Sequence, residues 1–259
     1  EVPAIKRPFL PQHLTDQTEP FQLEKIVFVQ AGGTDPNNAF AEVEWVSSLA
    51  QSDARIGGIV ADAPLENGTA VQAHLETLAK NPLVKGVRRL IQSEGPGFST
   101  QPVFIEAVQM LPSYQLSFDI CVLHHQLGDV LQLVEACPNV SFVLDHFGKP
   151  DIKSGLMSPW AAQIQQLAQF PNVQCKLSGL ITEAEHTNWQ LPDLRPYIDH
   201  VLDVFTPERV MYGGDWPVSL LAIDSWAGWV RTAETAVADL TAVEKEAIFY
   251  KNCLKFYRL

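Results

Sequence analysis

The sequence predicts an α/β fold of the (β/α)8 TIM-barrel class, formed by a single domain over residues 1–259. Three observations lead to this prediction. The length of 259 residues matches one such barrel. Short apolar, β-branched runs alternate with segments of helical periodicity, which indicates a parallel sheet covered by helices. Polar and charged residues collect directly after the apolar runs, where a barrel keeps its chemistry.

Seven apolar runs have the length and composition of buried strands, and they cover residues 25–31, 55–61, 84–91, 116–123, 140–145, 173–177 and 210–212. The segments that separate and follow them combine helical periodicity with good helix formers, over residues 38–51, 70–80, 101–111, 126–137, 159–170, 194–205, 225–240 and 242–257. Residues 1–21 are rich in Pro and Gln and predict a loop with at most one helical turn. Since seven strands do not close the usual barrel, we expect its first strand to be missing from the chain and to lie upstream of residue 1.

An open doubly wound sheet would show the same alternation of strands and helices. It is disfavoured because no GxGxxG or GxxxxGK[ST] motif follows any of the seven runs. The barrel is therefore the preferred fold class.

Composition limits the partners and the location of the protein. The net charge of −12 opposes binding to a phosphate backbone, and no Lys/Arg cluster offsets it, so no nucleic-acid partner is expected. No signal peptide and no apolar run of 18 residues is found, so we expect no membrane association and a cytoplasmic location. Four dispersed cysteines without a CxxC pair fit reduced core thiols. A homo-oligomer is left open.

Two motifs carry the strongest candidates for catalytic residues. In the stretch VLDHFGKP over residues 143–150, Gly148 and Pro150 force a turn that would hold His146 at the barrel mouth. In RVMYGGDWP over residues 209–217, two glycines deliver Asp215 to the end of the last strand, where a carboxylate suits a general base or a metal ligand. The alternatives are a capping or packing histidine and a helix N-cap aspartate.

Further charged residues stand at other strand ends. Arg88 is suited to gripping a substrate carbonyl or carboxylate, although a structural ion pair explains it nearly as well. His124 fits a position at the mouth. Asp119 is a further candidate substrate-binding residue; it would point into the barrel, where it needs a cationic partner. Lys176 would neutralise a negative intermediate, or pair with Asp119 or Asp215.

Taken together, these motifs resemble the amidohydrolase-related family in its sugar-lactonase branch, which includes L-fuconolactonases, L-rhamnonolactonases and 2-pyrone-4,6-dicarboxylate lactonase. The resemblance rests on Gln30 and on residues 85–92, 117–121, 126–127, 143–150, 175–180, 213–218 and 252–257, in that order along almost the whole chain. It implies an amidohydrolase-type barrel in which Asp215 activates water, His146 binds substrate or a metal, and Arg88 contacts the substrate. His124 and Trp216 would shape the pocket.

The chain departs from the family at its start, because no His-x-His is present. The metal that this pair normally holds would keep only His146 and Asp215, too few ligands for a zinc site. We therefore predict no required cofactor and no firmly bound metal, with zinc as the candidate if a divalent metal takes part. The leading hypothesis is a hydrolase that opens the lactone ring of a sugar acid. The rivals are metal-dependent amide hydrolysis or nonoxidative decarboxylation in the same superfamily, and a catalytically inactive ligand-binding barrel.

Overall fold

A computed structural model describes residues 5–32 and 38–259 of the chain. Its central feature is one sheet of seven parallel strands that neighbour each other in chain order and curl into an incomplete barrel. The strands are β1 (Ile26–Val29), β2 (Ile56–Asp62), β3 (Val84–Arg88), β4 (Ser117–Ile120), β5 (Phe142–Leu144), β6 (Val173–Leu177) and β7 (Val210–Tyr212).

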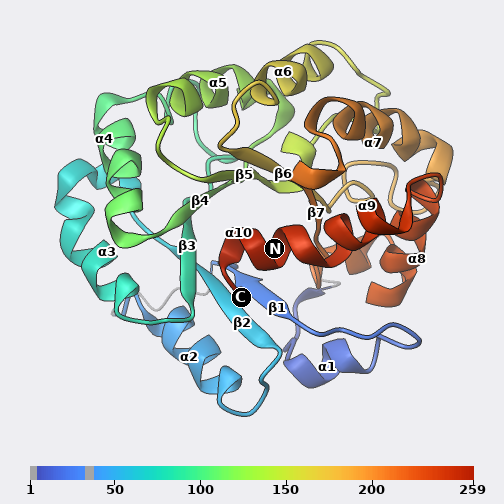
Figure 1. Cartoon of the computed structure of the whole chain (residues 1–259), viewed down its shortest axis with the longest axis horizontal. Helices are drawn as coiled ribbons and strands as arrows, with labels where there is room; N and C mark the ends of the chain where they lie inside the picture. The colour runs from blue at the N-terminus through green and yellow to red at the C-terminus, as the bar shows by residue number, and fades with distance from the viewer. Residues whose placement is uncertain (1–4, 33–37) are drawn as a thin grey trace.

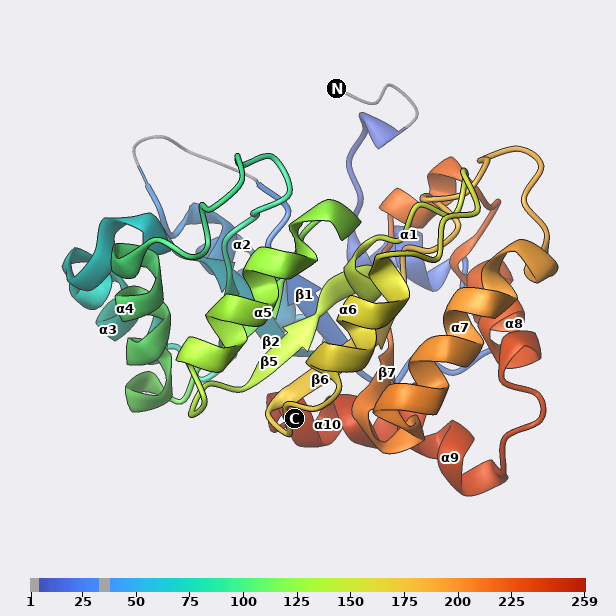
Figure 2. The ribbon, with the colours of Figure 1, turned by 90° about the horizontal axis from the view of Figure 1, so that it is seen from above.

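Helices surround the curled sheet, and one helical stretch crosses its N-terminal end (Figures 1 and 2). The α-helices are α1 (Pro11–Thr15), α2 (Ala41–Ala50), α3 (Gln72–Ala79), α4 (Pro102–Met110), α5 (Leu127–Ala136), α6 (Trp160–Leu167), α7 (Leu191–Phe205), α8 (Trp226–Ala236), α9 (Ala242–Glu246) and α10 (Asn252–Tyr257). A π-helical turn (Ala247–Lys251) joins α9 to α10. Short 3₁₀ segments cover Leu65–Val71, Leu111–Tyr114, His124–Gln126, Asp145–Gly148, Pro207–Arg209 and Val218–Leu221.

Side-chain alternation along the strands separates two hydrophobic regions. Outward residues such as Phe118 and Leu144 join the main core between the sheet and the helices. Val60, Val143 and Met211 form a separate cluster with Phe256 and Tyr257 near the C-terminus, in which Val27 and Val29 also pack. The barrel is therefore filled from its N-terminal end by α10, while the opposite end, which we call the mouth, stays open to the loops that follow the strands (Figure 2).

All seven predicted strands are present, but several are shorter than predicted. β3 ends at Arg88 instead of 91 and β4 ends at Ile120 instead of 123. Beyond these ends, Ile91, Cys121 and Val122 are buried outside the ladders, and Ile91 donates its backbone N–H to the Cys121 carbonyl. The helix predicted over 242–257 is divided by the π turn, and the loop predicted before residue 21 contains α1 where it is described.

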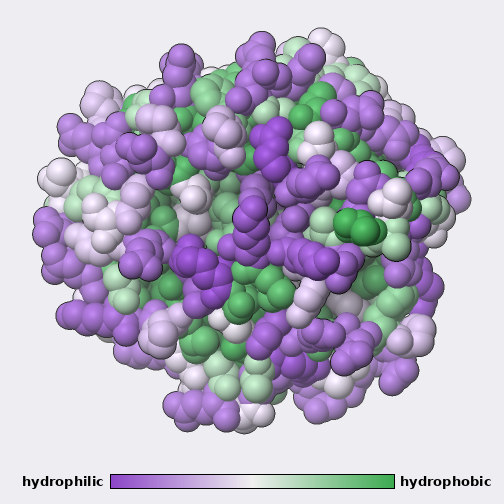
Figure 3. Space-filling model, in the orientation of Figure 1, coloured by the Kyte–Doolittle hydropathy of each residue, from purple (hydrophilic) through white to green (hydrophobic). Residues whose placement is uncertain are grey.

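The described residues show no ladder between β1 and β7, so the sheet has two free edges that face each other across a gap, which we call the seam. No helix of residues 5–32 and 38–259 is long and apolar enough to cross a membrane. The face that carries α10 is mostly hydrophilic, with hydrophobic patches that are small and separated (Figure 3).

Candidate active site

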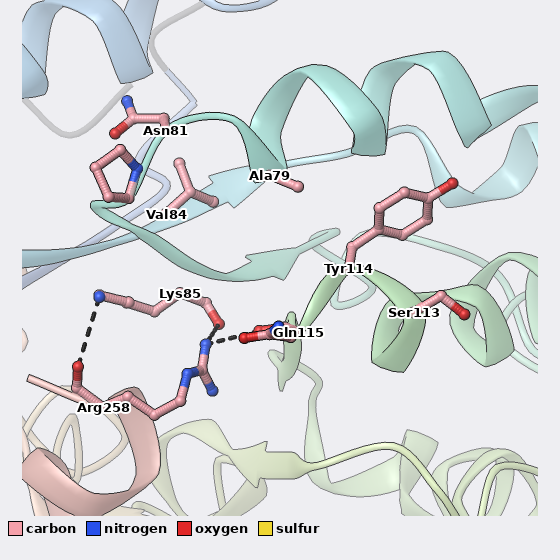
Figure 4. Close-up of a pocket in the computed structure, with 9 residues that line it drawn as sticks. Ala79, Asn81, Val84, Lys85, Ser113, Tyr114, Gln115 and Arg258 are labelled. Carbon is pink, nitrogen blue, oxygen red and sulfur yellow. Dashed lines mark hydrogen bonds between the residues drawn. The ribbon is translucent and has the colours of Figure 1, made fainter.

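The main cavity, of about 1480 Å³, opens at the mouth and extends along the seam. It is lined by charged and polar residues from the ends of five strands: Gln30, Arg88, Asp145, His146, Lys176, Ser178 and Asp215. A smaller cavity of about 340 Å³ lies at the other end of β3, and its wall holds Lys85 and Arg258 but no acid or histidine (Figure 4). The mouth cavity is thus the place where the sequence-predicted residues meet.

Asp145, directly after β5, is the centre of a buried ion-pair network. Its Oδ2 accepts a hydrogen bond from Arg88 Nη1 at 2.9 Å, and its Oδ1 lies 2.8 Å from Lys176 Nζ. The Nε and Nη2 groups of Arg88 donate to the side chain and the backbone carbonyl of Gln30. Arg88 has five donors and Lys176 has three, so both cations keep donors for a ligand in the cavity that they line.

Asp119, in β4, lies deeper in the barrel than Asp145, and its side chain has no exposure to solvent. Asp119 Oδ2 accepts hydrogen bonds from Lys176 Nζ at 2.6 Å and from the Tyr257 hydroxyl at 2.7 Å. The predicted need of Asp119 for a cationic partner is confirmed, and the partner is Lys176. The network therefore runs from the cavity wall to α10 and contains two positive and two negative side chains.

The pKa values in this network follow from burial and from neighbouring charges. Burial opposes the charged form of Asp145, but Lys176 and Arg88 outweigh it and hold the pKa of this carboxyl well below its usual range. Burial raises the pKa of Asp119, and Lys176 only partly opposes that shift. Burial would lower the pKa of Lys176, yet Asp119 and Asp145 hold it well above its usual value. Lys176 therefore stays charged at neutral pH.

His146 and Asp215 also line the cavity and face each other, with 3.7 Å between His146 Nε2 and Asp215 Oδ1. The Nδ1 atom of His146 is 2.8 Å from Ser178 Oγ, which orients the imidazole. Both residues have left-handed backbones, with φ of 54° and 46°. Such conformations cost free energy in a non-glycine residue and cluster at functional sites.

The two remaining predicted residues, Trp216 and His124, differ in their position relative to the cavity. Trp216 lines the cavity, but its indole donates to Gln17 and its ring packs edge-on against Phe9, so it also holds the N-terminal segment at the mouth. His124 is not part of the cavity wall; its Nδ1 lies 3.3 Å from the Lys149 carbonyl. Its role as a pocket residue stays a prediction.

One trio among the described residues brings metal-ligating atoms together, namely Cys121, Asp145 and His146, with the three atoms within 4.8 Å of one another. The trio suits a divalent ion poorly. Both carboxylate oxygens of Asp145 already contact cations, Arg88 and Lys176. Burial, with the charge of Asp145, raises the pKa of the Cys121 thiol to about 11, whereas a metal needs the thiolate. We therefore assign no step of the chemistry to a metal held by these three residues.

A curled parallel sheet whose strand ends supply a carboxylate, an imidazole and two cations defines a barrel of the hydrolase type. Comparison with known proteins agrees: a family model described as amidohydrolase matches residues 2–259, and the chain belongs to this family.

Several relatives are lactonases by name. An L-fucono-1,5-lactonase of Burkholderia ambifaria is 30% identical over 99% of this chain and 87% of that protein. An L-rhamnono-gamma-lactonase of Scheffersomyces stipitis is 25% identical over 79% of this chain and 69% of that protein. The crystal structure of an amidohydrolase from Burkholderia multivorans with bound zinc has a TM-score of 0.89, with 29% identity over 99% of this chain and 90% of that chain.

Sequence reasoning missed part of this arrangement. It did not assign Asp145 a role, although the residue precedes His146 in the same motif and directly follows a buried strand. It assigned none to Tyr257, which lies 138 residues from Asp119 in the sequence. Tyr257 lies in residues 252–257, which resemble the C-terminal residues of the family, but this resemblance does not indicate a chemical role for the tyrosine.

Proposed function

We propose that the protein hydrolyses the lactone of a sugar acid, an aldonolactone. The observation that carries this proposal is that Asp215 and His146, which face each other, line the same cavity as Arg88 and Lys176. The names of the lactonase relatives support the same substrate class.

In the proposed reaction, Asp215 accepts a proton from a water molecule while the water oxygen attacks the ester carbonyl carbon. The carbonyl oxygen becomes negative, and the free donors of Arg88 and Lys176 stabilise it. His146, held by Ser178, positions the water or the ring oxygen. Cleavage of the carbon–oxygen bond then yields a hydroxy acid, with the proton from water ending on the new hydroxyl group.

The experiment is a lactonase assay with a pH indicator on a panel of five- and six-membered aldonolactones. Because Asp215 is the proposed base, Asp215→Asn should lower kcat about 10²–10⁴-fold. Asp239→Asn is the matched control, since Asp239 is an exposed carboxylate with one ion-pair partner. Full activity of Asp215→Asn would refute the assignment of the base.

We further propose that an eighth strand closes the barrel along the seam. The N–H group of Ile26 donates to the carbonyl of Arg55, just before β2, and that of Gln30 donates to the carbonyl of Val60 in β2. By alternation, the N–H groups of Val27 and Val29 face the seam. Unpaired edges of this kind attract a strand. Hydrogen exchange tests this proposal. The backbone amides of Val27 and Val29 should exchange fast in this chain, and they should exchange more slowly in a form of the protein in which an eighth strand pairs with β1 along the seam. Equal rates in both forms would contradict it.

Free cysteines at all four positions also favour the reducing environment of the cytoplasm as the location.

A further inference from the structure

The charge network does not end at the strands, because its deepest carboxylate is bound by a residue of the last helix. Tyr257 is almost fully buried, and its hydroxyl donates to Asp119 Oδ2 at 2.7 Å. Its ring also faces the ammonium group of Lys176, with 5.5 Å between Nζ and the ring centroid. Tyr257 lines the main cavity beside Lys176, while its hydroxyl is bound to Asp119, which is not part of the cavity wall. It therefore contacts both members of the Asp119–Lys176 pair.

We infer that Tyr257 is a positioning residue for the lactonase reaction, which acts through Asp119 to fix Lys176 beneath the substrate. This inference rests on the proposed function.

Lys176 is shared between two carboxylates, at 2.6 Å from Asp119 and 2.8 Å from Asp145. Asp119 Oδ2 accepts from both Lys176 and Tyr257, while its Oδ1 has no hydrogen-bond partner among the described residues. If the Tyr257 hydroxyl is removed, Lys176 is left as the one donor, among the described residues, to a carboxylate that solvent does not reach. The ammonium group should then move toward Asp119 and away from Asp145, which in turn holds Arg88.

The end of the chain is built to keep Tyr257 in this place. Arg258 Nη2 donates to the backbone carbonyls of Lys85 and Gln115, at 3.1 and 2.6 Å, and Lys85 Nζ lies 3.5 Å from the Arg258 carbonyl (Figure 4). These contacts tie the residue after Tyr257 to the start of β3 and to the turn before β4.

Two further contacts complete the anchorage. Leu259 lies against Gly58, where an added Cβ would come within 3.2 Å of its Cδ2 atom. Asn252, at the start of α10, donates to the carbonyls of Pro207 and Val210 beside β7. The helix is thus fixed at both ends, and the hydroxyl of Tyr257 has a defined position relative to Asp119.

The test is Tyr257→Phe in the full chain, because phenylalanine keeps the ring and its packing and removes only the hydroxyl. We expect kcat to fall about 10-fold, as for the loss of a charge-assisted hydrogen bond, and KM to change less than about threefold. The control is Tyr197→Phe, which removes another buried tyrosine hydroxyl that hydrogen-bonds only to backbone carbonyls. It should lower stability at most and leave kcat unchanged.

A double-mutant cycle separates positioning from a purely structural role. If Tyr257 acts through Asp119, Tyr257→Phe should change kcat less than about twofold in an Asp119→Asn background. A 10-fold effect in both backgrounds, or a lower melting temperature with unchanged kcat, would overturn the inference. Absence of lactone hydrolysis by the wild-type chain would instead overturn the proposed function, so the two failures are distinguishable.

Discussion

Gly179, which follows Ser178 after β6, gives the sharpest test of the His146–Asp215 pair. Its φ is +65°, and a Cβ added there would lie 2.6 Å from His146 Nδ1 and 3.0 Å from Asp215 Oδ2. Real Cβ contacts are essentially never shorter than 3.0 Å. Gly179→Ala must therefore displace the imidazole, the carboxylate or the backbone that carries them.

The size of the effect follows from these distances. A contact of 3.4 Å, the lower limit of ordinary van der Waals contact, requires the His146 ring to move by about 0.8 Å, and the atom that must move is the Nδ1 that contacts Ser178. Displacements near 1 Å in a catalytic group cost about 10²-fold in rate. We expect kcat/KM to fall about 100-fold, which corresponds to about 2.7 kcal/mol of transition-state stabilisation.

The matched control is Gly155→Ala. Gly155 has nearly the same φ of +66°, but an added Cβ would meet no atom within 4 Å. Both variants should lose about 1–2 kcal/mol of stability because alanine is strained in the left-handed region, whereas only Gly179→Ala should lose activity. The assay is steady-state lactone hydrolysis together with urea unfolding of both variants. If Gly179→Ala kept kcat/KM within about threefold of Gly155→Ala, the catalytic role of the pair would be wrong.

Three further predictions concern the charge network and the cysteine beside it. Asp145→Asn leaves two buried cations with one carboxylate, so urea denaturation should show that the free energy of unfolding falls by about 3–5 kcal/mol. For the exposed control Asp239→Asn it should fall by less than about 1 kcal/mol. Equal losses in the two variants would show that the buried ion pairs contribute little to stability. Because the pKa of Asp145 is lowered on folding, its contribution to stability is present above the unfolded pKa of about 3.9 and is lost as the pH falls through the lower folded value. The difference between wild type and Asp145→Asn should therefore stay constant from about pH 5 to 7 and shrink only below about pH 4, and a difference that grew on acidification would contradict the sign. Cys121→Ser should leave kcat/KM within about threefold of wild type, with or without added zinc, whereas a 10–100-fold loss would show that Cys121 takes part in a metal site.

Much of the fold could be predicted because it depends on local patterns. β-Branched runs such as residues 173–177 and 210–212 specify strands that the structure reproduces residue for residue. Strand ends such as Arg88 and Asp215 reach the mouth in any parallel barrel, because parallel strands place their carboxyl ends on one side.

The rest could not be predicted, because it depends on which inward side chains meet across the barrel. Arg88 and Lys176 could each have paired with several acids, and the structure places Asp145 between them. His124 follows its strand as predicted, but its Nδ1 lies 3.3 Å from the Lys149 carbonyl, and His124 is not among the residues that line the cavity. The contact of Tyr257 with Asp119 joins residues that no local pattern relates.

The balance of charges in the network fits the chemistry of lactone opening. The two cations and two carboxylates of the network sum to no net charge, so the network keeps no unpaired ion when an uncharged lactone binds, while Arg88 and Lys176 still direct N–H donors at the lactone carbonyl oxygen. Hydrolysis converts this neutral ring into a carboxylate. The product then leaves a protein whose net charge is −12, and that field repels anions. The acidic surface and the cationic donors are therefore compatible, because the donors act on charge that develops inside the cavity and the surface acts on charge that leaves it.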